Sequence, residues 1–125
     1  MDYPRKCAWL AFALAGLIGA VFADEPPPSG RVVYERHCRT CHGGTAPADS
    51  PVGPSLTGIF GARAGSQASG VHSRVMIDSG ILWDRESLRR FLAEPQLEVP
   101  GTVMPVRVAD PKELESLLDF LESLR

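Results

Sequence analysis

Five consecutive residues, Cys38-Arg39-Thr40-Cys41-His42, constrain this chain more than any other feature of its sequence. Two thiols three residues apart can each add across a vinyl group of a haem, and the histidine that follows them can then bind the iron. The motif therefore predicts one covalently attached haem, with Cys38 and Cys41 as thioether residues and His42 as an axial iron ligand. A dithiol redox pair and half of a zinc site are the alternatives.

The other cysteine and histidine residues decide between these alternatives. The chain has three cysteines, and Cys7 lies in the predicted signal segment, so the mature chain keeps only one close pair. Zinc requires further ligands at short spacing, and His37 and His72 form a poor set. A thioredoxin-like pair requires a flanking strand, and none convincingly precedes Cys38. A covalent haem is therefore the interpretation that remains, and it uses both thiols of the mature chain.

The N-terminal segment has the composition of a secretory signal. Arg5 and Lys6 precede an almost unbroken apolar run, which ends at Phe22-Ala23. Cleavage there would release an exported, periplasmic protein, which is the expectation. If the segment stays uncleaved it would instead anchor the protein in the membrane, because about 17 apolar residues is the lower limit of a span. We divide the chain into a signal, 1–23, a Pro-rich leader, 24–29, and one domain, 30–125.

Helical signals surround a long loop-like stretch. Between residues 43 and 70 the chain is rich in Gly, Ala, Ser and Pro, and a loop of that length in a small domain needs something to wrap, for which a haem suffices. The predicted fold class is all-α. The expected helices run from about Gly30 to Cys41 with Ser29 as cap, from Ser73 to Ser79, from Arg85 to Ala93 with Asp84 as cap and Pro95 as terminator, and from Asp110-Pro111 through a leucine stripe to Leu124.

A second axial ligand has to come from the few remaining candidates. His37 is next to a thioether cysteine on the same helix and cannot reach the far face of the iron. Met76 lies in a helical stretch, where a methionine is by default core filler, whereas Met104 lies in the rigid extended segment 100–105. The residues alone favour Met104 over His72 or Met76.

Taken in order, several motifs resemble a class I c-type cytochrome, the small soluble monohaem type related to mitochondrial cytochrome c. The resemblance covers nearly all of residues 30–124, and the separation from His42 to Met104, 62 residues, fits the family. It implies a cytochrome c fold, with about four to five short helices and long loops around one covalent haem, and with crossing N- and C-terminal helices. The motifs are Gly53-Pro54-Ser55-Leu56, Gly58-Ile59-Phe60-Gly61, Trp83, Leu88 with Pro95, and Pro100-Gly101-Thr102 before Met104.

The resemblance also implies roles for residues around the haem. The carbonyl of Pro54 would accept the ring N–H of His42, which fixes the tautomer of that ring. Trp83 and Thr102 would lie near the haem propionates. Arg63 stands one place after the position of the family's arginine, and His72 lies where the family has an aromatic-rich stretch, so both are predicted in the haem environment with altered roles.

Other departures concern the second ligand and the docking face. Phe91 stands where the family has a tyrosine near the ligating sulfur, and Val106 replaces an aromatic residue. Without the predicted signal the chain has 11 basic and 14 acidic residues, a net charge of −3, and Lys112 is its only lysine. A lysine-ringed docking face is therefore absent, and the partner must differ from the family's usual one. The mildly acidic chain also excludes a typical nucleic-acid binder.

Iron with two protein ligands has no open site for a substrate, so the predicted function is electron transfer and not enzyme catalysis. The cofactor is haem c with its iron. The expected partners are an electron donor and an acceptor, such as a dehydrogenase or a terminal oxidase. Two alternatives stay open. One is a cytochrome subunit of a periplasmic dehydrogenase, which a large apolar patch would favour. The other is a gas-binding or peroxidase-like haem protein, which carbon monoxide binding would reveal.

Overall fold

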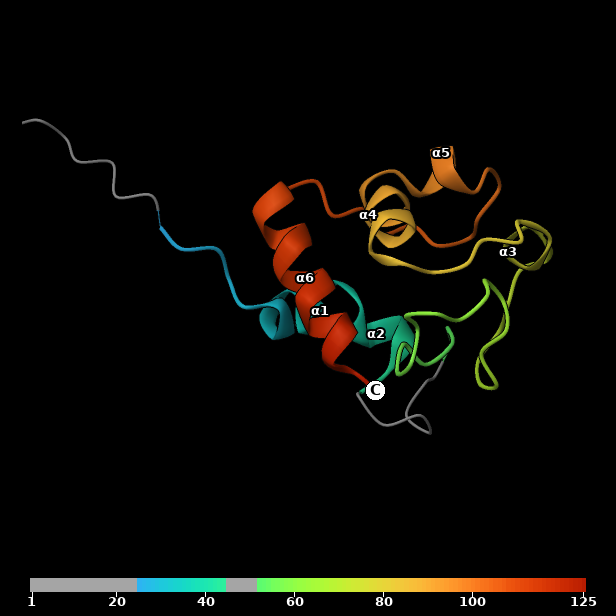
Figure 1. Cartoon of the computed structure of the whole chain (residues 1–125), viewed down its shortest axis with the longest axis horizontal. Helices are drawn as coiled ribbons and strands as arrows, with labels where there is room; N and C mark the ends of the chain where they lie inside the picture. The colour runs from blue at the N-terminus through green and yellow to red at the C-terminus, as the bar shows by residue number, and fades with distance from the viewer. Residues whose placement is uncertain (1–24, 45–51) are drawn as a thin grey trace, which may run out of the picture.

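A computed structural model describes residues 25–44 and 52–125 (Figure 1). Apart from one isolated antiparallel bridge between Arg63 and Leu82, the described residues contain no strand pairing, so the predicted all-α class is confirmed. Six helices occur in these residues, against the four to five expected. They are α1 (Gly30–His37), α2 (Arg39–His42), α3 (Arg74–Asp78), α4 (Arg85–Ala93), α5 (Pro95–Glu98) and α6 (Pro111–Ser123).

The first and last of these helices, α1 and α6, lie against each other as predicted (Figure 1). Gly30 makes this approach possible, because a Cβ atom added to it would lie 1.8 Å from the backbone oxygen of Ser116 and 2.7 Å from Cβ of Phe120. One turn later the ring of Tyr34 packs on that of Phe120, with 5.3 Å between the centroids. The absence of a side chain at one residue therefore sets how closely the two helices pack.

The hydrophobic core begins at this helix pair and continues beneath α4. Val33, Tyr34, Leu117 and Leu118 are almost completely buried at the contact of α1 with α6. The same cluster contains Trp83 and the α4 residues Leu88, Phe91 and Leu92, and the rings of Trp83 and Phe91 lie 5.2 Å apart. The cluster also contains Cys38, so the predicted attachment site belongs to the core.

Two helices begin where their capping residues predicted. The Asp84 carboxylate accepts a hydrogen bond from the backbone N–H of Ser87 at the start of α4, and the Ser87 hydroxyl accepts one from the backbone N–H of Asp84. At the start of α6 the Asp110 carboxylate accepts from the N–H groups of Lys112 and Glu113. These bonds satisfy donors that a helix N-terminus leaves without partners.

Two expectations about helix ends were wrong in detail, and a third was incomplete. The helix expected from Gly30 to Cys41 is interrupted at Cys38, where φ is −113°, and resumes as α2. Ser29 occupies the cap position of α1, but its side chain makes no capping hydrogen bond. Pro95 ends α4 as predicted but also begins α5, because a proline is well suited to the first turn of a helix.

Arginines on α4 pair with acidic side chains on α6. Nη2 of Arg85 lies 2.9 Å from Glu115 and 2.7 Å from Asp119, and Nε of Arg89 lies 2.6 Å from Glu115. These ion pairs join α4 and α6 at the surface, above the leucine contacts of the core.

The signal segment, 1–23, lies outside the described residues, and so does Asp24 of the leader. Among the residues that the structure describes, no helix is long and apolar enough to cross a membrane.

Candidate haem site

The two cysteines of the motif lie at the junction of α1 and α2. Both carry free thiols; Cys38 is buried and Cys41 is half-buried. Burial, with a smaller contribution from Cys41, raises the pKa of the Cys38 thiol to about 12. A redox-active cysteine normally has a lowered pKa, so this environment does not suit the dithiol alternative. The zinc alternative is not supported either, because the described residues contain no group of three or more Cys, His, Asp or Glu side chains placed to bind a metal.

The imidazole of His42 is held by one hydrogen bond. Its Nδ1 lies 2.7 Å from the carbonyl oxygen of Pro54, which is the contact that the resemblance implied. A carbonyl can only accept, so Nδ1 carries the proton and Nε2 keeps a free lone pair. Burial lowers the pKa of His42, although the bond to Pro54 acts in the opposite direction. The ring is therefore neutral, oriented, and able to bind a metal through Nε2.

Gly53 allows the backbone to lie directly against this ring. A Cβ atom added to Gly53 would lie 2.9 Å from both Cε1 and Nδ1 of His42. The Gly53 N–H donates to the carbonyl of Cys41 over 2.7 Å, which ties the segment to α2. Gly53 thus allows the carbonyl of Pro54 to reach Nδ1 of the imidazole.

Tyr34 supports the far end of the same motif, a contact that the sequence did not reveal. Its hydroxyl donates to the carbonyl of Gly43 over 3.1 Å, and the ring is 1% exposed. Burial is the main reason that the pKa of Tyr34 is raised to about 12, so the hydroxyl keeps its proton. The bond connects the α1–α6 crossing to the residue that follows His42.

Met104, the predicted second ligand, lies in a braced loop. The Thr102 hydroxyl accepts from the Met104 N–H over 3.3 Å, and the Thr102 N–H donates to the carbonyl of Val99 over 3.0 Å. Gln96 of α5 makes two bonds to this loop, donating to the carbonyl of Thr102 over 2.7 Å and accepting from the N–H of Gly101 over 3.2 Å. The sequence did not indicate Gln96, because a glutamine in a short helix carries no motif.

The competing ligands have different surroundings. Met76 is half-buried in α3 and packs against the core, as expected of a core methionine. His72 has its Nε2 2.7 Å from the carbonyl oxygen of Gln67, so that nitrogen is already engaged. The backbone of Met76 is also held, because its N–H donates to the Ser73 hydroxyl over 3.3 Å and its carbonyl accepts from the Ser79 hydroxyl over 2.7 Å. Met76 differs from Met104 in lying on a helix rather than in an extended loop.

The remaining predicted haem-environment residues divide into buried and exposed ones. Trp83 and Thr102 are 4% and 6% exposed, so both are buried. Arg63 is exposed, and its backbone forms the bridge to Leu82. Among the residues at departures from the family, Phe91 is buried beside Trp83 and Val106 is half-buried.

The chemistry of this donor set fits a haem. It combines two thiols for thioether bonds, a neutral imidazole with one nitrogen available, and a thioether sulfur on a fixed loop. A carbonyl that accepts the N–H of the other ring nitrogen is typical of a metal-binding histidine.

The chain is similar to known proteins in both sequence and fold. A family model described as cytochrome c matches residues 29–125. Cytochrome c2 iso-2 of Magnetospirillum fulvum is 34% identical over 103 residues, covering 82% of this chain and all of that protein. Cytochrome c2 of Blastochloris viridis is 30% identical over 119 residues, covering 94% and 92%. Among solved structures, cytochrome cH from Methylobacterium extorquens has a TM-score of 0.67 and 34% identity, with 75% of this chain and 94% of that chain covered.

Proposed function

This chain belongs to the cytochrome c family, and from that premise we propose that it carries electrons in a periplasmic redox chain with His42 and Met104 as axial ligands. As a member of the family it is an electron-transfer protein and not an enzyme, it contains covalently bound haem c, and it exchanges electrons with redox partners. The bound haem iron supplies the one-electron couple between the ferric and ferrous states. Cys38 and Cys41 are the proposed attachment residues.

The hydrogen bond from His42 to Pro54 is the observation that supports the proposal most. It leaves only Nε2 of the ring for iron, and it increases the basicity of that nitrogen. Because the ring is neutral, it does not have to lose a proton before it binds a metal. Gly53 has no side chain, so the backbone can lie against the ring.

The loop of Met104 supports the choice of the second ligand. A thioether is a weak ligand on a flexible side chain, so a backbone held in one conformation reduces the entropy lost when it binds. Thr102 and Gln96 provide that restraint through the bonds described above. Two protein ligands exclude a substrate from the iron and favour a high reduction potential.

The periplasmic location rests on the signal-like composition of residues 1–23 together with the similarity to bacterial cytochromes c2. Fractionation of cells that express the full chain tests it. The haem-bearing form should appear in the periplasmic fraction and begin near Asp24 when its N-terminus is sequenced. A haem-bearing form that retains residues 1–23 in the membrane fraction would contradict this part of the proposal.

Replacement of the methionine ligand tests the axial pair directly. Met104→Ala should abolish the methionine-to-iron charge-transfer band of the oxidised holoprotein, because the sulfur that gives rise to the band is gone. Met76→Leu is the matched control, since it also removes a half-buried methionine, and it should keep the band. Loss of the band in the Met76 variant, or its survival in the Met104 variant, would overturn the assignment.

The attachment residues are tested by removing both thiols. Cys38→Ala combined with Cys41→Ala should yield protein without covalent haem, measured as haem that stays with the polypeptide on denaturing gels. The single variant at each position shows whether one thioether bond is enough for attachment. Covalent haem in the double variant would refute the role of the motif.

A further inference from the structure

The most exposed large hydrophobic side chains are grouped on two segments of the chain. Among the described residues the four highest exposed fractions belong to Val103 (81%), Leu97 (79%), Val71 (75%) and Val52 (60%). Val103 directly precedes Met104, and Leu97 follows the Gln96 that braces its loop. Val52 directly precedes Gly53 and Pro54, which contact His42, and Val71 is bonded to Val52.

The second pair is tied to the proximal histidine by the backbone. The N–H of Val71 donates to the carbonyl of Val52 over 3.0 Å, so the two valines are neighbours. Val52 directly precedes Gly53, whose backbone lies against the imidazole of His42. Two exposed aliphatic side chains therefore lie at or next to the segment that contacts His42, and two lie in or next to the loop of Met104.

The charges next to this apolar surface are compensated within the chain. Arg107 pairs with Glu94, and Arg90 pairs with Glu98 over 3.0 Å. These four charged side chains are therefore already paired within the chain.

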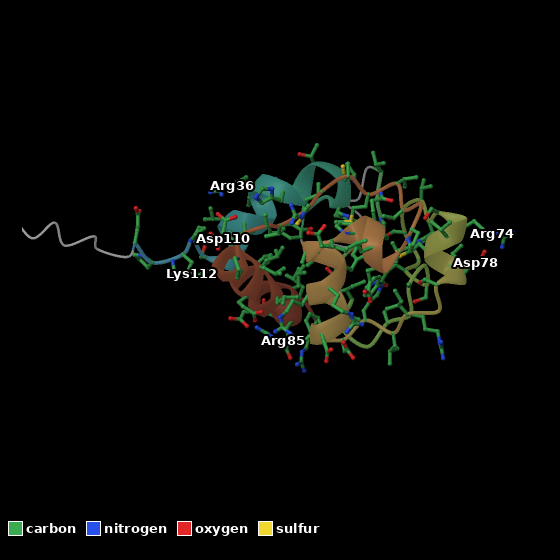
Figure 2. All side chains as sticks on the ribbon, turned by 90° about the horizontal axis from the view of Figure 1, so that it is seen from above. Arg36, Arg74, Asp78, Arg85, Asp110 and Lys112 are labelled. Atoms are coloured by element: carbon green, nitrogen blue, oxygen red, sulfur yellow. The ribbon has the colours of Figure 1, made fainter. Side chains whose placement is uncertain are left out.

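Other charged groups either balance or lie elsewhere. On α3, after Val71, Arg74 and Asp78 contribute opposite charges. Figure 2 shows these two residues at one end of the molecule, whereas Lys112 lies beside Asp110 at the opposite end. The one lysine that the chain has outside residues 1–23 is thus remote from α3.

We propose that Val52, Val71, Leu97 and Val103 form an apolar docking surface for a redox protein whose own docking face is apolar and uncharged. The proposal rests on the proposed function, because it assumes that the electron enters and leaves beside His42 and Met104. It defines the chemical class of the partner: association depends on burial of aliphatic groups and is insensitive to salt.

The size of the surface indicates a transient encounter. The four aliphatic side chains at these exposures together offer on the order of 500 Å², divided between the two pairs. A stable complex buries about 800 Å² on each partner, and weak redox encounters bury less. The surface is therefore too small for a permanent dimer and suits a carrier that has to dissociate after each transfer.

Voltammetry of the full-length holoprotein on gold coated with alkanethiols tests this chemistry without an identified partner. A methyl-terminated monolayer represents an apolar partner face, and a carboxylate-terminated monolayer represents an acidic one. We expect a reversible wave on the methyl surface, at the midpoint potential found with soluble mediators, and no loss of that wave between low and high salt.

Charge substitutions show whether the response depends on this surface. Val103→Lys should lower the coverage on the methyl surface about tenfold, because a lysine in the contact has to be desolvated. Leu82→Lys is the matched control: Leu82 is 54% exposed and lies on neither ligand-bearing segment. That variant should behave as the unmodified protein does.

Several results would overturn the proposal. One is a voltammetric wave that occurs only on the carboxylate surface and disappears at high salt. Another is equal coverage of the methyl surface by the Val103→Lys and Leu82→Lys variants. A third is a wave on the methyl surface whose midpoint potential is far from that measured with soluble mediators. Sedimentation that detects a dimer broken by Val103→Lys would identify a second copy as the occupant, which also overturns it. A redox titration with soluble mediators tests the proposed electron transfer independently of docking. If that titration is not reversible, both the proposed function and the docking surface are overturned.

Discussion

Replacement of Gly30 by alanine measures how closely the two terminal helices must approach. The added Cβ would lie 1.8 Å from the backbone oxygen and 2.6 Å from the carbonyl carbon of Ser116. Ordinary contact begins near 3.4 Å, so α1 and α6 have to separate by roughly 1.6 Å at this point. Because the nearest atoms belong to the backbone, no change of rotamer can relieve the clash.

The expected cost follows from the core beneath this contact. Overpacking costs about 1 to 3 kcal/mol, and here the separation also loosens the almost completely buried Val33, Leu117 and Leu118. We expect the upper end, a loss of about 3 kcal/mol in the free energy of unfolding, which lowers the melting temperature by roughly 15 °C in a domain of this size.

Thermal and denaturant unfolding of the holoprotein, followed by circular dichroism, provides the measurement. Arg31→Ala is the control, because it introduces the same residue at the next, exposed position of α1, and it should change stability by no more than about 0.5 kcal/mol. If Gly30→Ala stays within that same margin, the helices do not pack as closely as described and the reasoning fails.

Two further predictions concern Tyr34 and the surface of α6. Tyr34→Phe leaves the Gly43 carbonyl without its buried donor and should cost about 1 to 2 kcal/mol in chemical denaturation; an unchanged midpoint would contradict the role of this bond. Arg89 and Arg85 lower the pKa of Glu115 from 4.5 to about 2, so its stabilising effect is present above pH 4.5 and is lost as the pH falls towards 2. Solvent screens this exposed carboxylate, so Glu115→Gln should lose only about 0.5 kcal/mol at neutral pH, and a loss that persists in acid would be inconsistent with the ion pairs.

The sequence predicted the features that depend on local chemistry. Asp84 and Asp110 fixed the starts of α4 and α6, because a capping side chain acts on residues two or three positions away. The contact of Pro54 with His42 followed from a family motif rather than from a local rule. What could be predicted therefore came from short-range bonds and from resemblance.

Features that depend on tertiary contacts were missed. The interruption at Cys38 has no glycine or proline to announce it, and the bond from Tyr34 to Gly43 joins residues nine apart around that interruption. Gln96 acts on a loop whose position is set by α5, a helix that was not predicted. The exposure of Leu97 and Val103 was equally hidden, because a hydrophobic residue is by default expected inside.

The attachment residues come early in the chain, at the junction of α1 and α2, whereas α6, which packs on α1, comes last. Synthesis runs from the N-terminus, so Cys38, Cys41 and His42 emerge well before the leucines of α6 exist. Cys38 is 4% exposed only in the completed core. We expect both thiols to stay accessible until α6 packs on α1 and completes this core. Variants that hasten that docking would shorten the interval for haem attachment, even though they make the finished protein more stable.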